Sequence, residues 1–188
     1  NYFHILRRQL KRDFRKPLII MTPKSILRHK RATSRLEDMG EGTTFHRILW
    51  DDAQILPNEK IKLQKDDKIR RVVLCSGKVY YDLVAKRTKL GADDVAIVRL
   101  EQLYPFHEAR VRQILQKYER AKNVVWVQEE PKNMGAWSFV APLFAELLLI
   151  SQNLRYAGRK ASASPATGFA AVHNLEQEAL LDAAFGQF

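Results

Sequence analysis

Two adjacent carboxylates are the most unusual polar feature of the sequence. Glu129 and Glu130 follow an apolar run at residues 124–127, with only Gln128 between. Such a pair could perform acid–base chemistry if burial separated the two pKa values. The alternative is that both side chains pair with Lys or Arg at a subunit or domain boundary. We favour this alternative, because no histidine or nucleophile is placed in the sequence to support catalysis.

A second candidate site is the basic turn that follows the apolar run at residues 17–22. Lys24 and Ser25 come after Thr22 and Pro23 and would open a short helix over residues 24–31, with Arg28 one turn further on. Helix-terminal N–H groups together with two cations could hold a phosphate. The competing interpretation is an N-capped helix whose charges are simply solvated.

The remaining reactive side chains show no pattern of a catalytic or metal site. Cys75 is the single cysteine and lies inside an apolar run, which is typical of a buried structural thiol and a reducing compartment. The sequence contains no glycine-rich phosphate loop and no GxSxG motif. The histidines lack the spacing of metal ligands, so we predict no metal site; they are His4, His29, His46, His107 and His173.

The net charge of +11 is concentrated in the first fifth of the 188 residues. Residues 1–35 contain eleven Lys or Arg and one acid, Asp13, so the rest of the chain is almost neutral. A nucleic-acid-binding module would have to use residues 1–35 alone. We keep it as the alternative function.

The pattern of residues 1–35 favours a different interpretation. Phe3, Leu6 and Leu10 recur at helical spacing, and residues 17–22 are a continuous apolar run, expected to form a strand buried on both faces. A helix followed by a buried strand is the closing step of a parallel sheet. We therefore expect residues from a longer chain, or another subunit, to complete that sheet.

From residue 45 the sequence alternates between short apolar runs and amphipathic segments. Residues 45–50 could form an edge strand, and residues 51–68 are expected to be a surface excursion without chemistry. The alternation predicts an α/β fold with a mostly parallel sheet of about five strands and helices on both faces. Strands are expected at 72–75, 95–98, 124–127 and 154–157, and helices at 79–90, 107–118, 136–150 and 170–185.

Several stretches together resemble the C-terminal part of 2-oxoglutarate dehydrogenase, in its thiamine-diphosphate-dependent decarboxylating component. The resemblance runs from the first to the last residues, and only 51–68 look idiosyncratic. QEEPKNMGAW together with ASASPATG is similar to the 2-oxoglutarate branch and unlike the pyruvate and branched-chain relatives. The other stretches are KPLIIMTPKSILRH, VVLCSGKVYYDL, DVAIVRLEQLYPF and AVHNLEQEALLDAAF.

The resemblance implies a transketolase-like C-terminal domain at residues 36–188. Residues 1–35 would be the closing helix and strand of a preceding pyrimidine-binding domain, with a linker. The family's full-length enzyme decarboxylates 2-oxoglutarate in the tricarboxylic acid cycle, using thiamine diphosphate and magnesium, and transfers succinyl to a lipoyl group. No catalytic residue of the family can be assigned to this chain, so we expect the chain alone to be inactive and to bind neither cofactor.

The same resemblance implies a homodimer that works with a lipoyl-bearing succinyltransferase and dihydrolipoyl dehydrogenase. Some relatives respond to acetyl-CoA or nucleotides, which makes Lys24, Ser25 and Arg28 the predicted effector contacts. Glu129, Glu130, Asn133 and Trp137 are expected at an interface or at the active-site entrance. No membrane association is expected, and we favour bacterial cytoplasm over the mitochondrial matrix as the location.

Overall fold

The computed structural model describes residues 1–51, 53 and 61–186. It divides into two compact units, Asn1–Arg47 and Ile48–Phe188. Their boundary differs from the predicted domain boundary after residue 35, which stays a prediction. In the described residues, no helix is long and apolar enough to cross a membrane.

The first unit is organised around the predicted N-terminal helix, α1 (Tyr2–Lys11). The His4 side chain is buried and its Nε2 lies 2.9 Å from the carbonyl oxygen of Asp38. Burial lowers the pKa of the His4 side chain below its usual value. The Arg7 guanidinium donates to the carbonyl oxygen of Thr43. These contacts tie α1 to the loop around η2 (Glu37–Met39).

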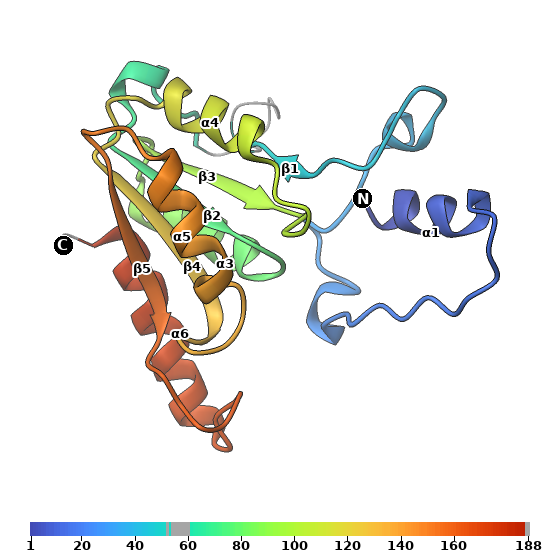
Figure 1. The fold of residues 1–188 in the computed structure, drawn as a ribbon. Coiled ribbons are helices and arrows are strands. Elements are labelled where there is room, and N and C mark those ends of the chain that lie inside the picture. The colour runs from blue at the N-terminus through green and yellow to red at the C-terminus, as the bar shows by residue number, and fades with distance from the viewer. Residues whose placement is uncertain (52, 54–60, 187–188) are drawn as a thin grey trace. The chain divides into compact units, whose positions relative to one another are not determined.

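The predicted strand at residues 17–22 does not form within the described chain. Its pairing with a strand from a longer chain or another subunit stays a prediction. No strand forms anywhere in residues 1–47 (Figure 1). Ile19 and Met21 are 81% and 90% exposed. A β-strand requires a hydrogen-bonded neighbour, and residues 1–47 supply none, so the segment is extended but unpaired. The predicted helix at 24–31 is wrong, because it is reduced to the single 3-10 turn η1 (Lys24–Ile26).

The second unit is built on the predicted sheet. It has five strands in the order β1-β3-β2-β4-β5. β2, β3, β4 and β5 are parallel, and β1 pairs antiparallel with β3 at one edge. The strands are β1 (Ile48–Leu49), β2 (Arg71–Cys75), β3 (Val95–Leu100), β4 (Asn123–Pro131) and β5 (Asn153–Arg159).

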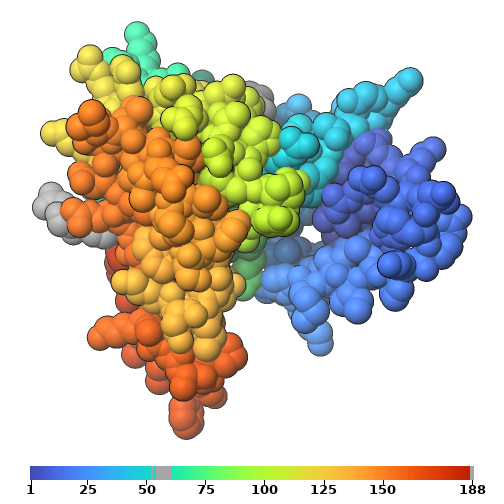
Figure 2. Space-filling view, viewed as in Figure 1, coloured from blue at the N-terminus to red at the C-terminus, as the bar shows by residue number. Residues whose placement is uncertain are grey.

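Helices cover both faces of this sheet, as the sequence predicts. One apolar core lies between the sheet and α4 (Glu108–Lys117) with α5 (Trp137–Leu147). The other core lies between the sheet and α3 (Val79–Leu90) with α6 (Ala170–Phe185). The atoms of α4 and α5 cover much of the face seen in Figure 2. Because both faces are covered, β2 is buried at every position, which is why its residues 72–75 form an apolar run.

The predicted surface excursion at 51–68 starts with a buried side chain, so that prediction is wrong at Asp51. The Asp51 carboxylate is fully buried and pairs with the Arg87 guanidinium of α3. It also accepts hydrogen bonds from the backbone N–H groups of Ile97 (2.6 Å) and Ala53 (2.9 Å). Asp51 and Arg87 thus attach the chain after β1 to the edge of β3 that faces away from β2. Residues 52 and 54–60 of the excursion lie outside the described residues.

Candidate functional site

The sheet has one point where the direction of strand progression reverses. β2 lies between β3 and β4, so the chain leaves β2 towards one side and later returns to the other. Residues at the ends of β2, β3 and β4 are in register, since Cys75 pairs with both Arg99 and Val127. In open α/β sheets, ligands bind beyond the carboxyl ends of the strands at such a reversal. The loops after β2 and β4 are therefore the expected place for a ligand.

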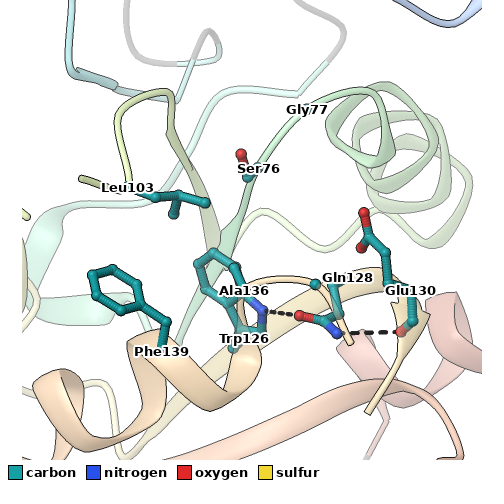
Figure 3. A pocket seen from close by; sticks show the side chains of 9 residues that line it. Ser76, Gly77, Leu103, Trp126, Gln128, Glu130, Ala136 and Phe139 are labelled. Atoms are coloured by element: carbon teal, nitrogen blue, oxygen red, sulfur yellow. Dashed lines mark hydrogen bonds between the residues drawn. The ribbon is translucent and has the colours of Figure 1, made fainter. Parts of the chain in front are cut away.

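A pocket of about 440 Å³ lies at this place. Its walls come from the loop after β2, the loop after β3, the end of β4 and the start of α5 (Figure 3). This volume is within the range of small-ligand sites, roughly 300–1,000 Å³. The residues that line it are Ser76, Gly77, Leu103, Trp126, Gln128, Glu130, Gly135, Ala136 and Phe139.

The local sequence explains the turn that forms one wall. Gly77 has a backbone φ of +73°, a left-handed conformation that favours glycine. Because of this turn, β2 stops at Cys75 and α3 begins at Val79, with Lys78 in the N-cap position. The predicted end of this strand at residue 75 is confirmed.

Gln128 holds the opposite wall together. Its Oε1 atom accepts hydrogen bonds from Trp126 Nε1 (3.0 Å) and from the Trp137 backbone N–H (2.9 Å). Its Nε2 atom lies within 3.2 Å of the carbonyl oxygens of Glu130 and Pro131, and 2.7 Å from that of Met134. The amide is therefore fully occupied inside the protein, and it shapes the pocket rather than offering a group to a ligand.

The two adjacent glutamates have separate surroundings, because neighbouring strand residues point to opposite sides. Glu129 forms an ion pair with Lys78. In the part of the chain that the structure describes, no cation pairs with the Glu130 carboxylate, which is exposed beside the pocket. Glu129 thus pairs with a cation inside the second unit. The predicted pairing of these glutamates at a subunit or domain boundary stays a prediction. The two side chains do not form an acid–base pair.

Asn133 and Trp137 connect the loop after β4 to other parts of the second unit. Asn133 exchanges two hydrogen bonds of 3.0 Å with the Ser162 backbone, its Nδ2 donating and its Oδ1 accepting. The Trp137 ring packs on Tyr156, with centroids 4.9 Å apart. Burial raises the pKa of Tyr156 to about 12. The structure thus gathers Glu129, Glu130, Asn133 and Trp137 around one loop, with a different contact for each.

The prediction that Cys75 is a buried structural thiol is confirmed. Its side chain is fully buried at the end of β2. Burial raises the pKa of the Cys75 thiol to about 12. Since the thiolate is the reactive form, this thiol is a packing group and not a nucleophile.

Lys24, Ser25 and Arg28 are exposed in the first unit. They lie in and directly after η1, which has only three residues. The longer helix whose first turn could hold a phosphate is therefore absent from residues 24–31. What remains at this place is two exposed cations and a hydroxyl group.

The fold and the pocket define an α/β domain with a doubly wound, mostly parallel sheet of the kind found at the C-terminus of transketolase-like enzymes. A family profile described as the 2-oxoglutarate dehydrogenase C-terminal region matches residues 33–185. The chain belongs to this family.

Whole-chain comparisons agree with that assignment. The chain is 59% identical over 190 aligned residues to the 2-oxoglutarate dehydrogenase E1 component of Brucella anthropi, and equally to that of Brucella ovis. The protein of the same name from Brucella abortus is 58% identical. Each alignment covers 99% of this chain and 19% of the relative's length. The alignments include the basic segment, and no comparison supports the nucleic-acid alternative.

Proposed function

We propose that this chain is the assembly-forming and regulatory C-terminal part of an enzyme that oxidatively decarboxylates 2-oxoglutarate and transfers succinyl to a lipoyl group. The 59% identity to E1 components along 99% of the chain is the observation that carries the proposal. The chain spans 19% of those relatives, so the reaction is proposed for the longer protein. Its bacterial relatives support a bacterial cytoplasmic location.

Thiamine diphosphate and magnesium are proposed to bind outside the described residues of this chain. In residues 1–51, 53 and 61–186, no group of three or more His, Cys, Asp or Glu side chains could hold a metal ion. The pocket at the reversal point carries the Glu130 carboxylate, which repels a diphosphate. We therefore assign both cofactors to other parts of the proposed enzyme.

The reaction is tested on the full-length protein with an artificial electron acceptor. We expect 2-oxoglutarate-dependent reduction of ferricyanide that requires thiamine diphosphate and magnesium, with pyruvate as the control substrate. Equal rates with pyruvate, or no turnover of 2-oxoglutarate, would contradict the proposal. Adding the lipoyl-bearing succinyltransferase and dihydrolipoyl dehydrogenase, the proposed partners, should then support reduction of NAD.

Residues 1–35 are proposed to close the preceding domain of the same enzyme. The exposed side chains of Leu18, Ile19 and Met21 support this, because pairing with a strand outside residues 1–47 would bury them. Glu129, Glu130, Asn133 and Trp137 are proposed to border a homodimer interface or the active-site entrance. Their common loop at the carboxyl end of β4 supports that assignment.

Lys24, Ser25 and Arg28 are proposed to contact an acetyl-CoA or nucleotide effector through phosphate groups. Two exposed cations and a hydroxyl group within five residues support the proposal. Isothermal titration of the full-length protein with acetyl-CoA and with AMP provides the test, and Lys24→Gln and Arg28→Gln should each weaken binding. Lys30→Gln, an exposed lysine of the same unit, is the matched control. Absence of heat with both ligands, under conditions where the enzyme turns over, would refute the proposal.

A further inference from the structure

The pocket at the reversal point has one charged end and one apolar side. Figure 3 shows Leu103 and Phe139 on one side of the opening, Glu130 on the other, and Trp126 between them. Phe139 is 39% exposed, and its ring lies 6.5 Å from that of Tyr104, which is 83% exposed. A ligand would therefore meet aromatic surface and a carboxylate within one opening.

The Glu130 carboxylate is the charged group in the lining of this pocket. The neighbouring amide of Gln128 is occupied by internal hydrogen bonds, and Glu129 is paired with Lys78. Among the described residues, nothing forms an ion pair with Glu130. A carboxylate in this setting would be costly to cover with an apolar group, because it would lose water without gaining a partner.

The position of this carboxylate is favoured by Gly135. A Cβ atom at residue 135 would lie 3.1 Å from Glu130 Oε2 and 3.0 Å from Gln128 Nε2. The absence of a side chain at Gly135, whose φ is +66°, thus leaves room for the carboxylate against the loop. The Gln128 hydrogen bonds hold the same loop in place. The charged wall of the pocket is therefore preformed.

The chemistry of the pocket selects among possible occupants. An anion is disfavoured by Glu130, and a purely apolar side chain would desolvate that carboxylate. A lysine or arginine side chain is complementary to both sides of the pocket. Its aliphatic stem can pack on the apolar side, and its cation can pair with the Glu130 carboxylate. A cation near an aromatic face gains further attraction. At about 440 Å³, the pocket has room for such a side chain together with its peptide neighbours.

We infer that this pocket is a docking site for a basic segment of a partner protein, with a lysine or arginine side chain inserted between Phe139 and Glu130. The inference deepens the proposal that Glu130 borders an interface, and it is independent of the reaction of the longer enzyme. The pocket should prefer a basic side chain over a neutral one, because one cation pairs with the Glu130 carboxylate. Salt should weaken docking, because the opening is accessible to solvent.

The test measures binding of a fluorescent peptide, acetyl-Gly-Leu-Lys-Leu-Gly-amide carrying a dye, to the full-length protein by anisotropy. The comparison peptide has norleucine in place of lysine, which keeps the stem and removes the charge. We expect the lysine peptide to bind about tenfold more tightly, the scale of one partly exposed charge-assisted contact. Glu130→Gln should abolish this difference. Phe139→Ala should weaken binding of both peptides.

Glu119→Gln is the matched control. It removes the same charge from an exposed glutamate beyond α4, near the amino end of β4, and should leave the tenfold difference unchanged. Equal binding of both peptides, or a difference that persists in Glu130→Gln, would overturn the inference. Binding of n-butylamine as tight as that of the peptide would overturn the assignment to a protein segment. None of these readouts uses 2-oxoglutarate, so failure of the proposed reaction would be detected separately.

Discussion

At the scale of single residues, two buried polar side chains determine the shape of the second unit. Gln128 and Arg87 both lie where a sequence pattern predicts apolar residues. Arg87 continues the buried face of α3 that Tyr80, Leu83 and Val84 define at helical spacing. Gln128 continues the buried parity of Trp126 on β4. A polar residue on an otherwise apolar face was therefore the sequence signal that Gln128 and Arg87 have a structural role. Their hydrogen-bond partners could not be predicted, because those contacts depend on the folded structure.

The Gln128 network leads to a prediction about stability. Gln128→Leu keeps the approximate volume but leaves Trp126 Nε1 and the Trp137 N–H without their acceptor. Unpaired buried donors each cost about 1–3 kcal/mol, so we expect the free energy of unfolding to fall by about 3 kcal/mol. Urea unfolding of the chain measures the loss, and hydrogen exchange of residues 130–137 should accelerate.

Gln102→Leu is the control for this network. The Gln102 side chain donates one exposed hydrogen bond, to the carbonyl oxygen of Pro105. We expect its replacement to cost well under about 1 kcal/mol. Similar losses for both variants would show that the Gln128 amide has no special role.

A second residue-scale prediction concerns the thiol. Burial raises the pKa of Cys75 to about 12, from 9.0 for an exposed thiol. Iodoacetamide at pH 8 should leave the Cys75 peptide unmodified in the folded chain and alkylate it in urea, as read by mass spectrometry. Rapid labelling under native conditions would contradict the buried position.

The same pKa shift predicts a pH dependence of stability. The folded state keeps the thiol protonated, whereas the unfolded state releases the proton above pH 9. The contribution of Cys75 is therefore fully present below pH 9 and is lost as the pH rises towards 12. Cys75→Ala should flatten the alkaline part of the curve of unfolding free energy against pH.

At the scale of elements, sequence periodicity located the main strands and helices of the second unit, although the helix predicted at 136–150 ends at Leu147. The four predicted parallel strands and the helices at 79–90 and 170–185 are confirmed. The predicted strand at 17–22 does not form within residues 1–47, since an apolar run shows that a segment can be buried but not that a neighbour is available. The pocket could not be placed from the sequence, because the strand order that brings its walls together depends on contacts distant in sequence.

The junction of β4 and β5 supplies an element-scale prediction. A Cβ atom at Gly158 would lie 2.9 Å from the Gln128 carbonyl oxygen and 2.5 Å from the Tyr156 hydroxyl oxygen. Gly158→Ala should therefore push the strands apart and lower the free energy of unfolding by about 1–3 kcal/mol. Gly168→Ala is the control, because no atom lies within 4 Å of its Cβ position. Denaturant unfolding of both variants distinguishes close packing from a general effect of glycine.

At the scale of the whole molecule, exposed apolar side chains in the first unit should control self-association of the isolated chain. Ile19 and Met21 are 81% and 90% exposed on an unpaired extended segment. Such a segment can pair with other chains. We expect the chain alone to form oligomers that Ile19→Ser with Met21→Ser reduces, as measured by light scattering after gel filtration.

Leu36→Ser provides the comparison, since Leu36 is 82% exposed in the same unit but lies outside the extended segment. This variant should leave the distribution of oligomers unchanged. A monomeric wild-type chain at micromolar concentration would refute the prediction. An equal effect of Leu36→Ser would attribute association to general surface hydrophobicity instead.

The Asp51–Arg87 pair also has a consequence for solubility. β1 covers β3 only at Leu100 and Arg99, so the earlier residues of this sheet edge lack a strand neighbour in β1. Asp51 takes the N–H of Ile97, and Arg87 Nη1 donates to the carbonyl oxygen of Val95 at 3.2 Å. Two side chains thus occupy backbone groups that would otherwise recruit a foreign strand. We therefore expect the buried Asp51–Arg87 pair to reduce aggregation through this edge of the sheet.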